Sequence, residues 1–187
     1  MSKHAILVID MLNDFVDPKG ALFCPDGQKI IPKIRELVDF AHENDIHVVF
    51  VQEAHRVGDA DFRVRPVHAI KGTWGSDFVP DLRPGDQDYV VQKRRHSSFT
   101  YTDMDLYLRE EGIDTVVVTG VWTNVCVRST ASEALYHAYR VIAISDGCAS
   151  KDEEMHQAGL RDMALFSRIM TVDEYQKEFG KEKVRTA

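Results

Sequence analysis

The 187-residue sequence contains little cysteine and no long hydrophobic run. Cys24, Cys126 and Cys148 are odd in number and lack a Cys-x-x-Cys spacing, which argues against a disulfide framework and a structural zinc site. No apolar stretch approaches the roughly 20 residues with which a helix crosses a membrane. No charged segment followed by an apolar core opens the chain either. These absences predict a cytoplasmic protein without a membrane partner.

Positive charge is also scarce, and the net charge is −7. A nucleic acid or an anionic membrane requires a basic face, and the short run Lys93-Arg94-Arg95 does not supply one. The first predicted strand is not followed by a glycine-rich phosphate fingerprint, so dinucleotide binding is disfavoured. With 44% hydrophobic residues, the chain can bury one sizeable core. We therefore expect a single domain over residues 1–187 that acts on a small molecule.

Apolar runs alternate with helical patterns along the chain, which predicts an α/β fold with about six parallel strands covered on both faces. The strands are expected at residues 5–9, 46–52, 89–92, 115–119, 140–144 and 168–172. A helix from Gln28 should bury the face that includes Ile34 and Leu37. Two later helices should each bury one apolar side, comprising Ala131, Ala134, Leu135 and Ala138 in the first and Met155, Ala158, Gly159, Met163 and Phe166 in the second.

The stretch from Val116 to Thr130 combines a strand, a tight turn and the start of a helix. We expect Thr123 to cap this helix, which would place Cys126 in its first turn. Unpaired backbone N–H groups and the helix dipole favour a thiolate there, so Cys126 is a candidate nucleophile. Alternatively, Cys126 is a small buried cysteine that only packs.

An acid and a base follow two other predicted strands. Asp10 ends the apolar run Ala5–Ile9, and Lys93 follows the run Tyr89–Gln92. The carboxyl ends of parallel strands share one edge of the sheet, where ligands of open α/β sheets bind, so Asp10, Lys93 and Cys126 could converge. Tyr89 to Val91 look buried throughout, so strand alternation does not decide which basic side chain faces the crevice. A structural ion pair of Asp10 and Lys93 is the alternative.

Four segments together resemble the isochorismatase-like cysteine hydrolases, which include nicotinamidases and the amidohydrolases of N-carbamoylsarcosine and ureidoacrylate. The segments are Val8-Ile-Asp-Met-Leu-Asn-Asp-Phe15, Lys71-Gly-Thr-Trp-Gly75, Lys93-Arg-Arg-His-Ser-Ser-Phe99 and Thr119-Gly-Val-Trp-Thr-Asn-Val-Cys-Val127. The match runs from about residue 5 to residue 166 in the order found in the family. Leu12 departs from the pattern, because many members carry Gln there.

The resemblance implies a three-layer α/β/α sandwich of Rossmann-like type and a catalytic triad. It assigns Asp10 as the general base and acid, Lys93 as the cation, and Cys126 as the nucleophile. It also implies a cis peptide between Val121 and Trp122, with the backbone N–H groups of Trp122 and Cys126 as oxyanion donors. The pattern Lys-x-x-x-Ser-x-Phe places the catalytic lysine at Lys93, which leaves Arg94 and Arg95 structural or at a subunit contact.

The substrate pocket is expected to include Phe15, His68 and Trp74. In nicotinamidases an Asp-x-His and a later His bind a zinc-like ion, and the matching positions here are Glu53, His55 and His68. The Glu53 side chain is one methylene longer than the Asp of nicotinamidases and would displace the ion. Single histidines in loops are usually solvated, so we expect no metal and no other cofactor.

We therefore expect a cysteine amidohydrolase that cleaves a C–N bond of a small amide, carbamoyl or ureido compound through a thioester-type intermediate. We expect the protein to assemble as a homo-oligomer. A metal-dependent nicotinamidase is the first alternative, and a non-catalytic binding or assembly domain is the second. Isochorismate cleavage is disfavoured, since members of that type lack the cysteine.

Overall fold

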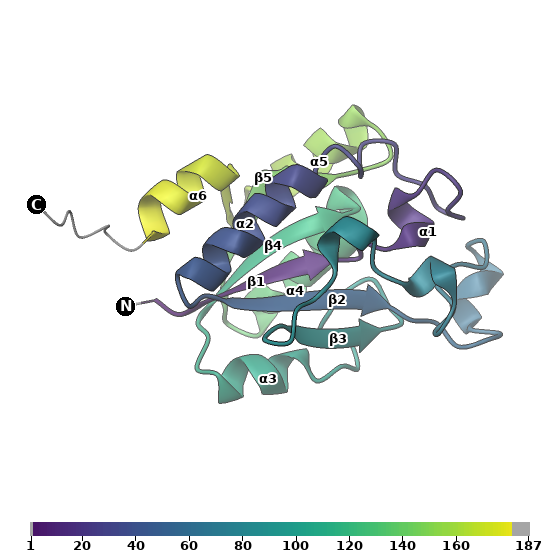
Figure 1. Ribbon diagram of the computed structural model, residues 1–187, viewed down its shortest axis with the longest axis horizontal. Helices are drawn as coiled ribbons and strands as arrows, with labels where there is room; N and C mark the ends of the chain where they lie inside the picture. The colour runs from purple at the N-terminus through teal and green to yellow at the C-terminus, as the bar shows by residue number, and fades with distance from the viewer. Residues whose placement is uncertain (1, 181–187) are drawn as a thin grey trace, which may run out of the picture.

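The computed structural model describes residues 2–180, which fold around one parallel sheet of six strands. The strand order is β3-β2-β1-β4-β5-β6 (Figure 1). The strands are β1 (His4–Ile9), β2 (His47–Glu53), β3 (Tyr89–Lys93), β4 (Thr115–Val121), β5 (Arg140–Ala149) and β6 (Arg168–Met170). The chain order reverses direction between β1 and β4, which is where open α/β sheets form their ligand crevice.

Helices cover both faces of the sheet and make the predicted three layers. On one face lie α2 (Ile31–Glu43) and α6 (Val172–Phe179), which contact each other and the sheet (Figure 1). The other face is covered by α3 (Met104–Glu110), α4 (Arg128–Tyr136) and α5 (Glu153–Met163). The expected three-layer α/β/α architecture is therefore confirmed.

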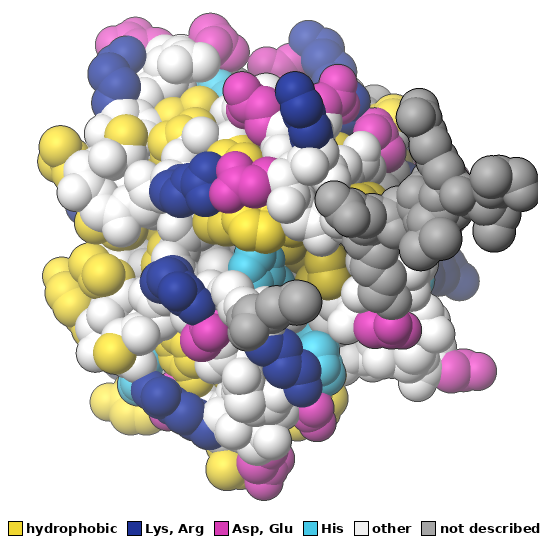
Figure 2. All heavy atoms as spheres, turned by 90° about the vertical axis from the view of Figure 1, so that its left-hand side faces the viewer, with side chains coloured by type: hydrophobic (Ala, Val, Ile, Leu, Met, Phe, Trp, Pro, Cys, Tyr) yellow, Lys and Arg dark blue, Asp and Glu magenta, His cyan; other side chains and the backbone are white. Residues whose placement is uncertain are grey.

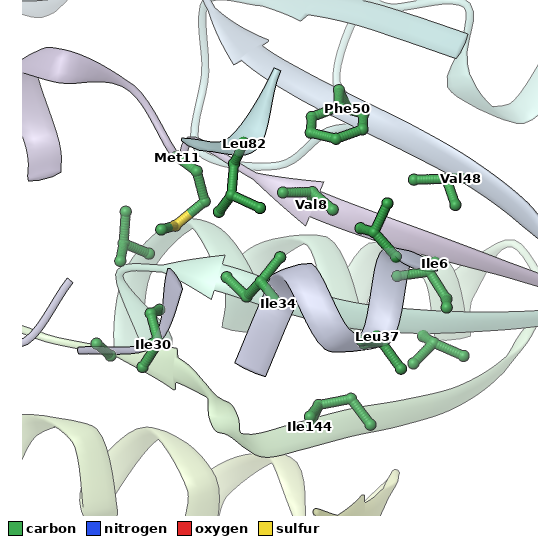
Figure 3. Packing of buried hydrophobic residues seen from close by; sticks show 14 of the residues in the cluster. Ile6, Val8, Met11, Ile30, Ile34, Leu37, Val48, Phe50, Leu82 and Ile144 are labelled. Carbon is green, nitrogen blue, oxygen red and sulfur yellow. The ribbon is translucent and has the colours of Figure 1, made fainter. Parts of the chain in front are cut away.

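Two apolar cores form because alternate residues of each central strand point to opposite faces. In β1, Ile6 and Val8 belong to the core under α2, whereas Leu7 belongs to the core under α4. Figure 3 shows Ile6 and Val8 facing the α2 side chains Ile34 and Leu37. Both faces of the central strands are apolar for this reason, which accounts for their continuous hydrophobic runs.

The edge strand β3 differs from the prediction. Val90 is 39% exposed, whereas Val91 and Lys93 are buried. The expectation that residues 89–91 are all buried is wrong, since β3 has a neighbour on one side only. Alternation does operate in β3, and it turns Lys93 inward with Val91 and leaves Arg94 exposed.

Two helical faces are also narrower than expected. Leu135 and Met155 are exposed, as are Ala138 and Ala158. Ala138 lies beyond the end of α4 at a positive φ, so the helical period no longer governs its direction. The buried side of α5 is formed by Gly159, Leu160 and Met163 instead.

The loops at the carboxyl edge of the sheet contain five short helices, namely α1 (Asn13–Val16), η1 (Ala60–Arg63), η2 (Trp74–Ser76), η3 (Pro80–Leu82) and η4 (Thr123–Val127). At the opposite edge, seen in Figure 2, charged side chains of both signs surround hydrophobic ones. A hollow of about 530 Å³ there is lined by residues that include His4, Tyr139 and Phe166. None of the predicted site residues lines it. Within the part of the chain that the structure describes, every helix is too short or too polar to cross a bilayer.

Candidate active site

The carboxyl ends of four adjacent strands bring the predicted catalytic residues together. Asp10 follows β1, and its backbone N–H donates to Val51 of β2. Glu53 and Lys93 end β2 and β3 and are register partners. Asp10 has a φ of 55°, a left-handed conformation that Asp tolerates better than most side chains, and this turns the chain sharply out of β1.

Lys93 lies at the centre of a buried cluster. Its Nζ is 2.7 Å from Oδ2 of Asp10, 3.7 Å from Sγ of Cys126 and 3.9 Å from Oε2 of Glu53. The ligand-forming atoms of Asp10, Glu53 and Cys126 lie within 4.8 Å of one another. All four side chains are at most 4% exposed. The structure thus places Asp10, Lys93 and Cys126 together, as the sequence predicted.

Burial and mutual charge determine how these groups are protonated. Burial raises the pKa of Asp10 to about 6, with Lys93 acting against the increase and Glu53 adding to it. Burial lowers the pKa of Lys93, but Asp10, Cys126 and Glu53 more than offset this and hold it above its usual range. Burial also raises the pKa of the Cys126 thiol well above normal, although Lys93 opposes it. Despite burial, Lys93 and the two histidines His55 and His68 hold the pKa of Glu53 well below its usual range. These shifts favour, at neutral pH, two carboxylates, an ammonium and a thiol in the cluster.

Burial of the Cys126 sulfur thus acts against the thiolate that the helix start was expected to favour. Cys126 lies in η4, a single π-helical turn that continues directly into α4. The expected N-cap is also absent, since the Thr123 hydroxyl hydrogen-bonds Nδ1 of His156 at 2.8 Å instead of capping the turn. Desolvation of the enclosed sulfur outweighs the helix-end effect, which is modest within one turn.

Helix α5 and the end of β5 hold η4 in place. His156 binds Thr123, and the Ser150 hydroxyl donates to the Asn124 side chain at 2.5 Å. A Cβ atom on Gly159 would lie 2.9 Å from the backbone N and Cα of Asn124. Because real Cβ atoms do not approach backbone so closely, only glycine allows α5 to pack against the turn that carries Cys126.

The expected cis peptide joins Val121 and Trp122, directly before η4. The roles of the Trp122 and Cys126 backbone N–H groups as oxyanion donors stay predictions. The other two cysteines lie apart from the cluster. The Cys24 thiol donates to the Ser150 carbonyl at 2.9 Å, and the Cys148 thiol faces the Val118 carbonyl at 3.9 Å.

The motif residues Asn13 and Asp14 tie the pocket loops together. The Asn13 amide donates to the Trp74 carbonyl, and Asp14 Oδ2 accepts from the Ala69 backbone N–H at 2.7 Å. A Cβ on Gly75 would lie 2.1 Å from the same carboxylate, which explains the glycine of the Lys71–Gly75 motif. These contacts of Asn13 and Asp14 set the positions of the loops on which Phe15, His68 and Trp74 lie.

The predicted pocket residues are only partly brought together. The buried rings of Phe15 and His68 meet edge to face, with centroids 5.7 Å apart. Trp74, at 48% exposure, has no ring contact with either of them among the described residues. Its part in the pocket stays a prediction. Arg94 and Arg95 bind the buried Asp59 carboxylate at 3.3 and 3.1 Å, which gives both a structural role.

Comparison with known proteins identifies the family. Residues 4–174 match the model of the Isochorismatase domain. The chain belongs to the isochorismatase family. A solved isochorismatase-like hydrolase from Alkaliphilus metalliredigens is 63% identical, with a TM-score of 0.93 over 95% of this chain and 99% of that one. This isochorismatase-family protein is therefore a hydrolase with the fold of its relatives.

Several relatives of this isochorismatase-family protein are amidases. An N-carbamoylsarcosine amidase from Thermoplasma acidophilum is 34% identical, with a TM-score of 0.83 over 92% of this chain and 98% of that one. A ureidoacrylate amidohydrolase from Acinetobacter baylyi is 30% identical over 189 residues, covering 87% of this chain and 77% of the relative. The family thus includes enzymes that act on C–N bonds of linear amides.

A pyrazinamidase from Pyrococcus horikoshii, solved in complex with zinc, is 30% identical, with a TM-score of 0.85 over 90% of this chain and 99% of that one. In the present isochorismatase-family protein, donor atoms of Glu53, His55, Asp61 and His68 lie within 4.8 Å of one another. However, Nη2 of Arg65 lies 3.2 Å from Oε1 of Glu53 and 2.6 Å from Oδ2 of Asp61. A zinc ion would lie roughly 2.0–2.2 Å from such oxygens and would collide with the guanidinium. With Arg65 in place, these residues do not fit a metal.

Sequence reasoning missed three residues of this site. The sequence pattern relates Glu53 only to a possible metal, because the predicted strand ends one residue too early to make Glu53 a register partner of Lys93. Arg65 lies in a long loop whose spacing signals no contact with Glu53. His156 lies 33 positions after Thr123, and only the packing of α5 on η4 brings the two together.

Proposed function

We propose that this hydrolase cleaves a C–N bond of a small linear amide, with carbamoyl or ureido compounds as the substrate class. The observation that carries this proposal is the buried arrangement of Lys93 between Asp10, at 2.7 Å, and Cys126, at 3.7 Å. A base, a nucleophile and a fixed cation are the groups that acyl transfer through cysteine requires.

In the first half of the reaction, the Asp10 carboxylate takes the proton of the Cys126 thiol as sulfur attacks the substrate carbonyl carbon. The C–S bond forms and the carbonyl π electrons move to oxygen. The backbone N–H groups of Trp122 and Cys126 are proposed to bind this oxyanion. When the oxyanion collapses, the C–N bond breaks and Asp10 returns the proton to the departing nitrogen, which leaves as ammonia or an amine.

In the second half, water attacks the thioester carbonyl and gives its proton to Asp10. The C–S bond then breaks, and the proton returns to sulfur, which regenerates the thiol. The Lys93 ammonium stays protonated throughout, because three acidic neighbours raise its pKa. It stabilises whichever of Asp10 and Cys126 carries the negative charge at each stage.

The substrate class is supported by the resemblance to an N-carbamoylsarcosine amidase and a ureidoacrylate amidohydrolase. The metal-dependent nicotinamidase alternative is disfavoured by Arg65, which lies among the residues that would ligate the metal. A purely binding domain would not need a thiol beside the buried Asp10–Lys93 pair, so the cluster also argues against that alternative. A homo-oligomer in the cytoplasm stays our prediction for assembly and location.

The test is ammonia release from a panel of N-carbamoyl amino acids, ureido acids, nicotinamide and simple aliphatic amides. We expect turnover of at least one carbamoyl or ureido compound, and no turnover with Cys126→Ser. Hydroxylamine added during turnover should divert the acyl group from the thioester to a hydroxamate or hydroxyurea product. Release of ammonia at equal rates by the wild type and Cys126→Ser, or activity confined to nicotinamide, would reject the proposal.

A further inference from the structure

Arg65 lies inside a ring of four side chains that otherwise has the composition of a cation site. The ring consists of Glu53, His55, Asp61 and His68, and all but Asp61 are fully buried. Two nitrogen atoms of the ring converge on one carboxylate oxygen, Oε1 of Glu53. Nε2 of His55 is 2.8 Å and Nε2 of His68 is 3.6 Å from Oε1 of Glu53. Nε2 of His68 is buried and has no hydrogen-bond partner among the described residues.

The guanidinium of Arg65 holds the two carboxylates of the ring together. Its Nε donates to Oδ2 of Asp61 at 2.7 Å. Its Nη2 reaches the same oxygen at 2.6 Å and Oε1 of Glu53 at 3.2 Å. The planar fork of arginine suits this two-point contact, and its charge does not depend on pH in the physiological range.

The buried carboxylate of the ring needs a cation, and the Arg65 guanidinium supplies one. Glu53 is fully buried, and a buried carboxylate needs a positive partner. Lys93 lies 3.9 Å from one carboxylate oxygen of Glu53, Oε2. The other oxygen, Oε1, faces Arg65 and the two histidines. A metal at Oε1 and the Arg65 guanidinium would compete for the same oxygen atoms and would repel each other.

We propose that Arg65 is a built-in replacement for a divalent metal, and that removing its side chain opens a latent metal site made of Glu53, His55, Asp61 and His68. In this protein the guanidinium supplies the charge that keeps Glu53 beside Lys93. The inference does not depend on the proposed reaction, since its test measures metal binding and not turnover.

The test is Co²⁺ binding to the full-length protein, measured by equilibrium dialysis and by visible absorption of the bound ion. Arg65→Ala should bind one Co²⁺ per chain at least about tenfold more tightly than the wild type does. Arg63→Ala is the matched control, because Arg63 is exposed on the same loop and has no ion pair among the described residues. It should behave as the wild type does. The double variant Arg65→Ala with His68→Asn should lose the gained site.

Stoichiometric Co²⁺ binding by the wild type would overturn the proposal, as would an Arg65→Ala variant that binds no better than Arg63→Ala. If Arg65→Ala is poorly soluble, Zn²⁺ in the growth medium should restore soluble protein, because the ion would take over the missing charge. Arg65→Met, which keeps part of the apolar stem, provides a second variant for the same measurements. If both variants are poorly soluble and Zn²⁺ restores soluble protein for neither, this would also count against the proposal that Arg65 replaces a metal.

Discussion

Lys93 and Asp10 form a fully buried ion pair, with 2.7 Å between Nζ and Oδ2. Their chain positions are 83 residues apart, and the carboxyl ends of β1 and β3, which flank β2 in the sheet, bring them together. Removing one partner of such a pair typically costs about 3–5 kcal/mol, because the other charge is left buried and uncompensated. The pair therefore serves the stability of the sheet edge as well as the proposed chemistry, and variants must be tested for folding before activity is interpreted.

Cys126→Ala and Cys126→Ser should lower turnover by roughly three orders of magnitude or more while the fold persists, because no other thiol lies near Asp10 and Lys93. Turnover is measured with the best substrate of the amide panel, and folding by circular dichroism. Cys24→Ala and Cys148→Ala are the matched controls. Both thiols face backbone carbonyls away from the cluster, so activity should remain within about twofold. Comparable loss in Cys148→Ala would contradict the assignment of the nucleophile.

Lys93→Met should make Cys126 less reactive, because the ammonium is the group that lowers the pKa of the thiol against burial. At pH 8, alkylation by iodoacetamide should be at least about tenfold slower, and its pH profile should move to higher pH. The measurement uses a background without Cys24 and Cys148, so that only Cys126 reports. Arg94→Ala and Arg95→Ala should leave the profile unchanged, since both arginines bind Asp59. If the pH profile shifts in an arginine variant but not in Lys93→Met, the assignment of Lys93 as the cation beside Cys126 is wrong.

The pH profile of kcat/KM should show an acidic limb near pH 6. Burial raises the pKa of Asp10 to about 6, and only its ionised form can accept the thiol proton. Lys93 and the Cys126 thiol stay protonated through this range, because both pKa values are raised. Activity should therefore fall about tenfold for each pH unit below the limb. If activity recovers fully when the enzyme is returned to pH 7.5, the loss at low pH came from titration and not from unfolding. A constant kcat/KM between pH 7 and pH 5 would remove Asp10 from the role of base.

Gly159→Ala should impair catalysis from a position outside the cluster. The new methyl group would lie 2.9 Å from the Asn124 backbone, so either η4 or α5 must move. Overpacking of this kind costs about 1–3 kcal/mol, and a shift of the turn would misplace the thiol. We expect kcat to fall about tenfold or more and the melting temperature to drop. Ala158→Ser, at the adjacent exposed position of α5, should change neither quantity. Wild-type kcat in Gly159→Ala would show that η4 tolerates displacement.

The order of residues is enough to predict the layers of the fold and the three residues at the centre of the site. Six apolar runs of strand length separated by helical patterns lead to a parallel sheet, because parallel strands need long crossovers and buried faces. Residues that end such strands share an edge, which is why the sequence predicts that Asp10 and Lys93 lie close together. The motif around Cys126 supplied the third residue. The layers follow from local pattern, which a chain displays in its residue order, whereas the choice of Lys93 over Arg94 and Arg95 comes from the resemblance to the family.

The surroundings of these three residues follow from packing between distant segments and not from residue order. The register of β2 and β3 places Glu53 beside Lys93, and a loop fold brings Arg65 to Glu53 and Asp61. The burial of Cys126 reverses the expected direction of its pKa shift, and the Thr123 hydroxyl binds His156 instead of capping a helix. Each of these outcomes depends on side chains from distant segments competing for the same small volume. Residue order carries no measure of that competition, because desolvation and close contact arise only when the segments pack.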